Sequence, residues 1–244
     1  MAKNKSKIHI GTSGWHYNHW KERFYPAGLA KNKWFEYYAR HFETVELNNT
    51  FYQLPKEETL QRWYELAPKG FVYSVKANRY ITHIKRLKDP ADELERFRQR
   101  IDILKEKLGP VLYQLPPSMH KDLGLLKDFL KLLGKRRMCV FEFRHESWFE
   151  QDCYELLEQF NAGFCIHDLQ GMKVPRIVTS DVIYIRFHGP AGKYRGNYTG
   201  IMLKGWAKWI RQHMKDVRNI YIYFNNDTNA YAVYNAGKLK ELIV

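Results

Sequence analysis

Ionisable side chains recur where short apolar runs of this chain end. Carboxyl and imidazole groups can exchange protons during catalysis, and the candidates for that role are Glu46, Glu142 and His188. Guanidinium and ammonium groups bind phosphate or carboxylate oxygens, and the candidates are Lys76, Arg144 and Arg186. Side chains that could add polar or stacking contacts to a ligand are Asn48, Gln114, His167, Trp15, Tyr194, Tyr198, Asn225, Asn226 and Asp227. These groups would form one polar site if the fold brings them together.

Eight apolar runs carry these groups, and each ends in a polar or ionisable residue. In chain order the runs are 8–13, 45–49, 72–76, 111–114, 140–145, 164–168, 183–188 and 220–227. Apolar residues at helical spacing occupy most of the gaps, as in Leu94, Phe97, Ile101 and Leu104. Strands that alternate with helices pair in parallel, so eight units in 244 residues predict a (β/α)8 TIM barrel. A doubly wound open sheet is the alternative, but it would not need a polar group on every strand.

Alternation within the strands predicts which side chains enter the barrel. In the run 183–188 three apolar side chains share one face, and Tyr184, Arg186 and His188 share the other. The apolar face must pack against helices, so the polar face is expected to line the lumen and its C-terminal mouth. By the same alternation the inward side chains are Glu46, Asn48, Ser74, Lys76, Gln114, Glu142, Arg144 and His167. The eighth strand is ambiguous, because Asn225 and Asn226 fall on opposite faces.

Arginines inside a barrel need carboxylate partners, and Glu46 and Glu142 are the candidates for pairing with Arg144 and Arg186. One interpretation is a structural layer of ion pairs that fills the lumen. The other is a ligand site in which Arg186 has a carboxylate partner and also binds an anion. Lys76 could form a Schiff base or bind an anion, and the nearby arginines favour phosphate or carboxylate binding.

A glycine-rich, cationic segment, residues 189–200, follows the seventh run. Barrel enzymes often hold phosphate at this position. The segment is neither a Walker A motif nor a dinucleotide fingerprint. Together with the cations it favours a phosphate-bearing small molecule as the ligand.

Two other chemistries can be weighed on the same residues. A metal-dependent barrel hydrolase or isomerase would draw its ligands from Glu46, Glu142, His167, Asp168, His188 and Asp227. No H-x-H or H-E-x-x-H spacing supports a metal, and fixed cations nearby oppose one, so we assign no metal ligand and leave any cofactor open. A glycosidase would use Glu46 and Glu142 as its two carboxyl groups, and one of them would have to stay protonated as the general acid. Contact with arginine would keep both ionised, which argues against this function.

Composition predicts a single domain that spans residues 1–244. The chain is 45% hydrophobic, and no linker, low-complexity tract or repeat divides it. Residues 1–7 lack the apolar stretch of a signal peptide and no run reaches membrane-spanning length, which favours a cytoplasmic protein without a membrane partner. The three cysteines, Cys139, Cys153 and Cys165, fit no metal or redox spacing and are expected to be reduced and mostly buried.

Charge points to polyanionic partners. The sequence has 40 Lys and Arg against 26 Asp and Glu, a net charge of +14. This surplus favours nucleic acid, whose binding weakens as salt rises. Four cations, Lys204, Lys208, Arg211 and Lys215, form a stripe on one face of a predicted helix, and residues 135–137 add a basic turn. A solvated outer helix face is the other interpretation of the stripe, and the oligomeric state stays open.

Short motifs in order along almost the whole chain carry a resemblance. They are GTSGW at 11–15, VELNNTFY at 45–52, VKA at 75–77, ITH at 81–83, LYQLPP at 112–117, EFRHESW at 142–148, YIRFHG at 184–189, FNND at 224–227 and NA at 235–236. The set resembles the YecE-like family (domain of unknown function 72). That resemblance implies a barrel fold and supplies no reaction, since shared fold does not transfer function. Asn229 departs from the pattern, because a glycine is expected there.

Two classes of function remain. The first is an enzyme, a hydrolase of phosphate esters, in which the lysine and arginines bind oxygens and the glutamates or His188 exchange protons. The second is a non-catalytic protein that binds nucleic acid or a phosphorylated metabolite, with Trp15, Tyr17, Trp148, Tyr194 and Tyr198 as stacking walls. The number of ionisable groups at one mouth favours the enzyme, because such groups are costly unless they are used.

Overall fold

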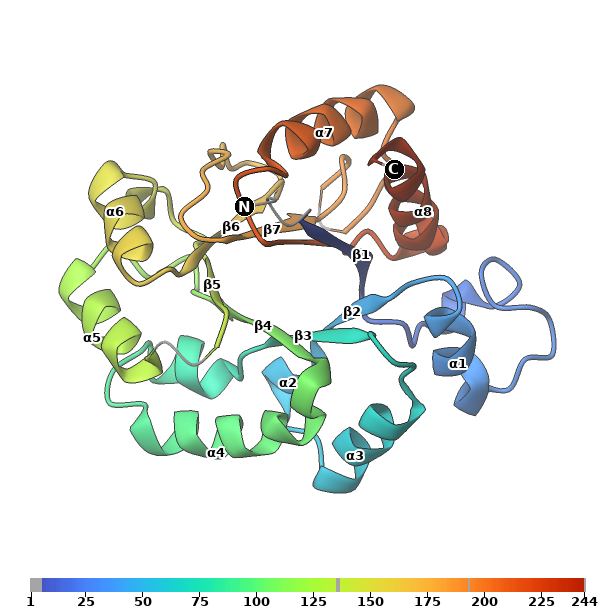
Figure 1. Ribbon diagram of the computed structural model, residues 1–244, viewed down its shortest axis with the longest axis horizontal. Coiled ribbons are helices and arrows are strands. Elements are labelled where there is room, and N and C mark those ends of the chain that lie inside the picture. The colour runs from blue at the N-terminus through green and yellow to red at the C-terminus, as the bar shows by residue number, and fades with distance from the viewer. Residues whose placement is uncertain (1–5, 135–136, 193, 244) are drawn as a thin grey trace, which may run out of the picture.

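A computed structural model describes residues 6–134, 137–192 and 194–243. Eight parallel strands pair in chain order and close into a barrel, with β8 beside β1 (Figure 1). The strands are β1 (Lys7–Ser13), β2 (Thr44–Leu47), β3 (Val72–Lys76), β4 (Leu108–Gln114), β5 (Cys139–Glu142), β6 (Gly163–His167), β7 (Val182–Phe187) and β8 (Asn219–Phe224). The predicted TIM barrel is confirmed.

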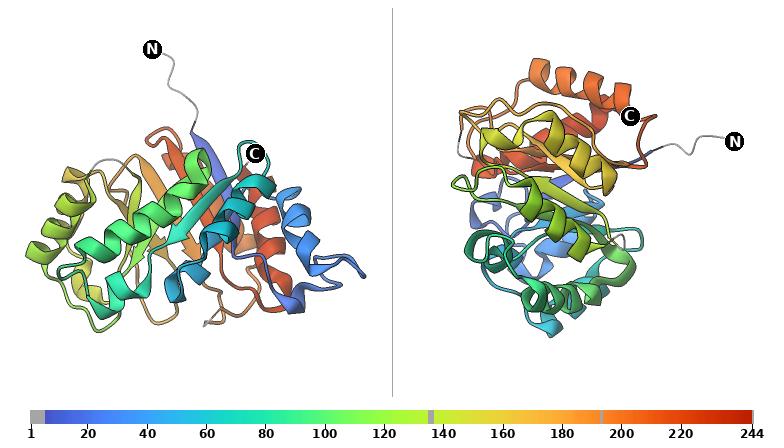
Figure 2. Two further views of the ribbon diagram at one scale, coloured as in Figure 1. Left: turned by 90° about the horizontal axis from the view of Figure 1, so that it is seen from below. Right: turned by 90° about the vertical axis from the view of Figure 1, so that its left-hand side faces the viewer.

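Helices surround the barrel on its outside (Figure 2). They are α1 (Trp34–Ala39), α2 (Asn49–Tyr52), α3 (Glu57–Leu66), α4 (Ala91–Ile101), α5 (Leu123–Leu133), α6 (Gln151–Gln159), α7 (Gly200–His213) and α8 (Tyr231–Ile243). Shorter helical turns are η1 (Asn18–Trp20), η2 (Lys31–Lys33), η3 (Tyr80–Ile84), η4 (Asp102–Lys107), η5 (Glu146–Trp148) and η6 (Thr228–Ala230). The connection from β6 to β7 differs from the others, because residues 168–181 cross as a loop without a helix.

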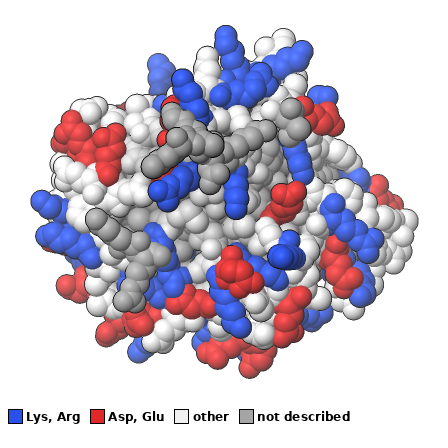
Figure 3. Space-filling view, viewed as in Figure 1, with Lys and Arg blue, Asp and Glu red and all other residues white. Residues whose placement is uncertain are grey.

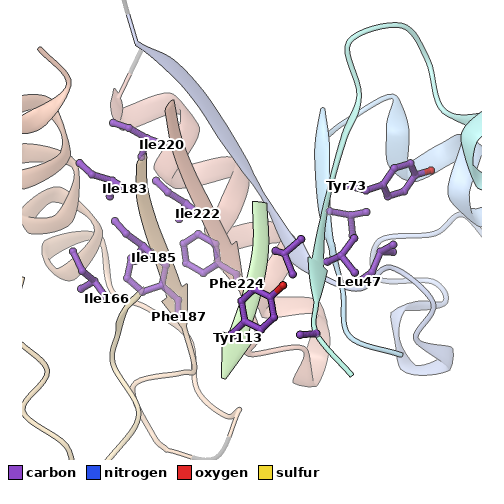
Figure 4. Close-up of a cluster of buried hydrophobic side chains, with 14 of the residues drawn as sticks. Leu47, Tyr73, Tyr113, Ile166, Ile183, Ile185, Phe187, Ile220, Ile222 and Phe224 are labelled. Atoms are coloured by element: carbon purple, nitrogen blue, oxygen red, sulfur yellow. The ribbon is translucent and has the colours of Figure 1, made fainter. Parts of the chain in front are cut away.

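The outward faces of the strands form the core between barrel and helices. On β7 and β8 the pairs Ile183 with Ile220 and Ile185 with Ile222 lie in register, and these four side chains are at most 1% exposed (Figure 4). Full burial of one such side chain stabilises the fold by roughly 1.5–3 kcal/mol. Packing of the apolar face therefore fixes the polar face toward the lumen, as the alternation predicts.

The lumen has two zones. Its inner part is packed with aromatic and apolar side chains, namely Leu112, Val140, Cys165, Val182, Tyr184, Tyr221 and Tyr223. The Tyr223 hydroxyl lies 2.6 Å from Thr44 Oγ1 and 2.7 Å from Ser74 Oγ, so this tyrosine joins β8 to β2 and β3. Charged residues lie nearer the C-terminal ends of the strands. A ligand would therefore approach from the C-terminal mouth.

Close approach of β1 and β2 depends on Gly11. A Cβ atom at this position would lie 2.2 Å from the backbone oxygen of Thr44, so a larger residue would push the strands apart. The Tyr38 hydroxyl of α1 bridges both strands, accepting from Thr12 N and donating to Thr44 O at 3.0 Å each. The resulting register places Ser13 beside Glu46.

The cationic stripe lies on the outside of the barrel. Figure 3 views the end at which the strands begin, and Lys and Arg side chains gather there over α7. Lys204, Lys208 and Arg211 of α7 are exposed, as is Lys215 just after it. Of the predicted basic turn, residues 135 and 136 lie outside the described ranges. The three cysteines are buried and form no disulfide.

Candidate functional site

Glu46 of β2 and Arg186 of β7 meet across the lumen in a two-pronged ion pair. Arg186 Nε donates to Glu46 Oε1 and Arg186 Nη2 donates to Glu46 Oε2, each at 2.8 Å. The remaining Arg186 Nη1 donates to Glu142 Oε2 of β5 at 2.7 Å. These three side chains are at most 2% exposed. The predicted convergence of the three residues and the predicted carboxylate partners of Arg186 are confirmed.

Glu46 uses both of its oxygens fully. Ser13 Oγ donates to Oε2 at 2.7 Å and the Tyr184 hydroxyl donates to Oε1 at 2.8 Å, in addition to the two bonds from Arg186. Burial would raise the pKa of Glu46, but Arg186 and these hydrogen bonds outweigh burial and leave the pKa below its ordinary value. Glu46 is therefore an ionised carboxylate without a proton to give.

Glu142 is neutralised from two sides. Arg144 Nε donates to Oε1 and Arg144 Nη2 forms an ion pair with the same oxygen, while Arg186 occupies Oε2. Burial would raise the pKa of Glu142, but the two guanidinium groups lower it well below its ordinary value. The Arg144 side chain is 8% exposed and lies closer to the mouth than Arg186. Two glutamates and two arginines thus form a charge layer, defined here as Glu46, Glu142, Arg144 and Arg186.

His188 follows β7 and lies against this layer, fully buried. Arg144 Nη2 lies 3.2 Å from His188 Nε2, which must accept because a guanidinium only donates. Burial and the neighbouring Arg186 lower the pKa of His188 well below its ordinary value, so the ring is neutral and carries its proton on Nδ1. Asn225 Nδ2 lies 3.4 Å from that nitrogen, so the Asn225 amide must turn its oxygen toward the ring to accept the Nδ1 proton. The geometry gives His188 no free basic nitrogen.

The predicted ligand-binding role of His167 is corrected by its hydrogen bonds. His167 Nε2 lies 3.0 Å from the backbone oxygen of Phe143, and Leu169 N donates to Nδ1 at 3.4 Å. Burial lowers the pKa of His167 to about 4, so the ring is neutral. Both nitrogens hold backbone in place, which leaves none for a ligand.

Tyr198 and Asn226, both predicted to bind a ligand, are buried and hydrogen-bonded to neighbouring groups of the protein. Tyr198 is 3% exposed; its hydroxyl donates to Asp168 and accepts from Gly189 N at 2.7 Å. Asn226 is fully buried, and its Nδ2 donates to Asn235 Oδ1 at 2.9 Å. The two side chains tie the glycine-rich segment and α8 to the barrel.

The glycine-rich segment closes on itself. Gly192 N donates to Gly189 O at 3.1 Å and Arg195 N donates to Gly192 O at 3.0 Å. Gly189 has a φ of 103°, and a Cβ there would lie 2.2 Å from Arg195 O, so the turn requires glycine. The N–H groups of Gly189, Gly192 and Arg195 therefore already have acceptors within the protein. Lys193 lies outside the described residues.

Lys76, the last residue of β3, differs from Arg144 and Arg186 in having no carboxylate partner among the described residues. Its ammonium donates to Gln114 Oε1 at 2.6 Å and lies 4.0 Å from the centre of the Phe51 ring. Among the described residues no carboxylate oxygen lies within 4 Å of it, since Glu46 and Glu142 pair with arginines. Burial, together with the positive charge of Arg186, lowers the pKa of Lys76 to about 7.

Asn48 lies beside Lys76. The register of β2 and β3 pairs Glu46 with Ser74 and Leu47 with Val75. Continued by one residue, that register places Asn48 next to Lys76 on the neighbouring strand, with Cα atoms about 5 Å apart. The Asn48 Oδ1 atom is buried and has no hydrogen-bond partner in the described structure.

The remaining predicted residues lie in different places. The Tyr194 ring is 43% exposed and its centre lies 5.4 Å from that of His188, so it borders the mouth. Trp15 is 8% exposed and lines a cavity beside the mouth. The Asp227 carboxylate lies 3.7 Å from His19 Nε2, and its backbone oxygen accepts from Trp20 Nε1 at 2.8 Å. Asp227 therefore holds η1 and has no contact with the charge layer.

Three residues near the mouth are absent from the predicted site, namely Phe51, His83 and Trp63. The rings of Phe51 and His83 lie 4.9 Å apart, and Phe51 covers Lys76. Burial and the cations Lys76 and Arg79 lower the pKa of His83 to about 4. Phe51 lies just after the run 45–49, and His83 lies in the segment that follows the run 72–76. Their positions after predicted strands could have identified both as candidates for the mouth. Trp63 has the helical spacing of a core residue, so its sequence position gives no such signal.

The cavity beside the mouth has a volume of about 890 Å³. It lies where β1 and β2 end and is bounded by η2, α1 and α3; Trp15, Phe35 and Trp63 form its apolar wall, and Asn48 and Arg62 line it as well. We call it the side pocket. Within the described ranges no three His, Cys, Asp or Glu side chains are arranged to hold a metal. None of the described helices has the length and apolarity of a membrane span.

The turn at Asn229 keeps the geometry for which glycine was expected. Asn229 has a φ of 56° and Ala230 a φ of 61°, both in the left-handed region. Asparagine tolerates that region better than other residues with a side chain. Its Oδ1 also accepts a hydrogen bond from Arg23 Nη1 at 2.6 Å. The departure from the family pattern therefore leaves the turn intact.

Known proteins resemble this chain over much of its length. Residues 9–244 match the model of the family described as "Protein of unknown function DUF72". UPF0759 protein YunF of Bacillus subtilis is 27% identical over 270 residues, covering 97% of this chain and 94% of YunF. UPF0759 protein YecE of Escherichia coli K12 is 32% identical over 143 residues, covering 58% of this chain and 50% of YecE.

Solved structures extend the comparison. The crystal structure of a DUF72 family protein from Thermotoga maritima has a TM-score of 0.88 at 28% identity, covering 97% of this chain and 99% of that one. A DUF72 family protein from Enterococcus faecalis has the same fold, with a TM-score of 0.84 at 17% identity over 97% of this chain and 95% of that one. The resemblance in the motifs is thereby confirmed, and the chain belongs to the DUF72 family, the YecE-like family of TIM barrels.

Proposed function

We propose that the barrel mouth binds the phosphate group of a small molecule and that Lys76 supplies the charge that holds it. The observation that carries this proposal is the placement of the Lys76 ammonium. It lies at the C-terminal end of β3, with a neutral amide and a ring as its contacts and no carboxylate within 4 Å among the described residues. A half-buried cation without a counter-ion favours an anionic ligand.

The charges around Lys76 support an anion as the ligand. The charge layer holds two carboxylates and two guanidinium groups and is neutral, so the layer does not balance the positive charge of protonated Lys76. Burial and the positive charges of Lys76 and Arg79 lower the pKa of His83 to about 4, so His83 adds no positive charge beside Lys76 at neutral pH. Gln114, whose Oε1 accepts from Lys76, and Arg144, whose side chain is 8% exposed, are further donors for an anion.

Binding is favoured over hydrolysis because the predicted proton-exchanging groups are engaged. Glu46 and Glu142 have lowered pKa values, and His188 is neutral with Nε2 accepting from Arg144. A general acid must still hold its proton at the working pH. Lys76, whose pKa lies at about 7, is the described mouth residue that can both give and accept a proton near neutrality. Ester hydrolysis, the second candidate, would therefore depend on Lys76 and not on the glutamates.

Calorimetric titration with inorganic phosphate and with ribose 5-phosphate tests the proposal, at low salt and a pH of about 6.5 where a phosphate ester is largely dianionic. The Lys76→Met variant lacks the charge-assisted hydrogen bond to the phosphate, so it should bind at least about tenfold more weakly than the unaltered protein. Lys121→Met is the matched control, because Lys121 is already paired with Glu150 and Asp152. Absence of binding to the unaltered protein, or equal binding by Lys76→Met, would refute the proposal.

A further inference from the structure

The side pocket and the proposed phosphate site share one residue, Asn48. Glu46 of β2 and Asn48, which follows that strand, line the pocket, and the register of β2 and β3 continued by one residue places Asn48 next to Lys76. Its volume of about 890 Å³ falls within the range of small-molecule sites. A ligand whose phosphate lies on Lys76 could therefore extend past Asn48 into the side pocket.

The wall of the pocket is built from aromatic rings set at steep angles. The rings of Trp15 and Trp63 are 5.4 Å apart at 80°, and those of Trp15 and Phe35 are 5.1 Å apart at 62°. A flat ring that stacks on one member of such a corner meets the edge of the other, and both arrangements are favourable for aromatic pairs. The corner therefore selects a planar aromatic group over a bulky aliphatic one.

Asn48 adds a polar group with unused hydrogen-bonding capacity. Its Oδ1 atom is buried and has no partner among the described residues, which is costly unless a ligand or water supplies a donor. A side-chain amide presents an acceptor and a donor side by side, which matches the edge of a nucleobase. Arg62, which also lines the pocket, is a second donor.

We propose that the side pocket holds the base of a nucleoside monophosphate whose phosphate lies at Lys76. The base stacks in the corner of Trp15 and Trp63, and Asn48 pairs with its edge. This assignment rests on the proposed phosphate site for the position of the phosphate. It names the class of ligand that the mouth takes.

Titrations with adenosine 5′-monophosphate, uridine 5′-monophosphate, ribose 5-phosphate and adenosine separate the base from the phosphate. The nucleotides should bind at least about tenfold more tightly than ribose 5-phosphate, because stacking on an aromatic side chain adds to affinity. Trp63→Leu should abolish that preference and leave ribose 5-phosphate binding unchanged, whereas Trp63→Phe should restore part of it. Trp209→Leu is the matched control, since Trp209 lies on α7 and stacks on His213 outside the barrel.

Each result decides between the two proposals. Equal binding of nucleotides and ribose 5-phosphate would overturn the base site and leave the phosphate site standing. Binding of adenosine that Trp63→Leu abolishes, without any binding of ribose 5-phosphate, would support the base site and refute the phosphate site. No binding of either nucleotide or of adenosine, or nucleotide preference unchanged in Trp63→Leu, would overturn the base site.

Discussion

The charge layer and the rim, defined here as Lys76 and Asn48, differ in how many of their polar groups have hydrogen-bond or ion-pair partners. In the layer, four hydrogen bonds occupy the oxygens of Glu46, and Arg186 uses three donors on two carboxylates. At the rim, Lys76 contacts an amide and a ring, and Asn48 Oδ1 has no partner in the described structure. Asn48 comes two residues after Glu46 of the layer, and Lys76 ends the neighbouring strand β3.

This difference separates the polar groups that hold the barrel from those that are available to a ligand. A buried ion pair with every hydrogen bond made is costly to break, and it has little capacity for a new partner. A cation without a counter-ion, or a buried amide oxygen without a donor, is costly to keep, and a ligand that pairs with it recovers that cost. Substitutions in the charge layer should therefore mainly lower stability, whereas substitutions at Lys76 and Asn48 should mainly weaken ligand binding.

The largest expected effect is on stability, in Arg186→Met. Removing the guanidinium leaves Glu46 and Glu142 buried without it, so unfolding free energy should fall by about 3–5 kcal/mol and Tm by about 10 °C. Arg186→Lys keeps the positive charge but loses the planar guanidinium, so its unfolding free energy should fall by less than that of Arg186→Met. Denaturant and thermal melts measure both. If Arg186→Lys keeps its stability but loses ribose 5-phosphate binding, Arg186 contacts the ligand and the division between layer and rim is wrong.

A smaller and opposite effect is expected for stability in Lys76→Met. Because the pKa of Lys76 falls from 10.5 in the unfolded chain to about 7 in the folded protein, the folded state holds fewer protons between those values. The lysine therefore destabilises the protein below a pH of about 7, and this cost is relieved as pH rises toward 10. After allowance for partial exposure, Lys76→Met should gain on the order of 2 kcal/mol near pH 6.

The stability gain of Lys76→Met should shrink as pH rises from about 6 toward 10. Thermal melts of the variant and the unaltered protein at several pH values measure this change. Gln114 is partly exposed, so water can replace its lost contact with Lys76. Lys121→Met is again the control, because hydrogen bonds to Asp152 and Glu150 raise the pKa of Lys121 and its removal should bring no gain. A gain in Lys76→Met that does not change with pH would contradict the assigned burial of its charge.

The smallest expected effect concerns the stripe on α7. Combined Lys204→Gln, Lys208→Gln and Lys215→Gln substitutions should change unfolding free energy by less than about 0.5 kcal/mol, since all three side chains are exposed. If the outer surface contacts nucleic acid, the slope of log affinity against log salt should fall by about 2–3. Single- and double-stranded oligonucleotides titrated at several salt concentrations measure it. Ribose 5-phosphate binding should be unchanged, and a loss there would connect the stripe to the mouth.

Much of the fold follows from local patterns that the sequence displays directly. The alternation in the run 183–188 turns Arg186 and His188 toward the lumen, because a strand with one apolar face can pack only that face against helices. Eight such runs with helical gaps specify the barrel. The absence of a helix between β6 and β7 was not predictable, since residues 168–181 are long enough for one.

The sequence by itself determined the barrel, the inward-facing residues and the need of its buried arginines for carboxylates. Only the tertiary structure decided that both glutamates are taken up by arginines and that Lys76 is left without one. It also decided that His167 and Tyr198 hold backbone, and that Trp15 and Trp63 meet in one wall. Alternation sets the direction of a side chain, whereas partners are chosen by distances across the lumen between strands far apart in the chain.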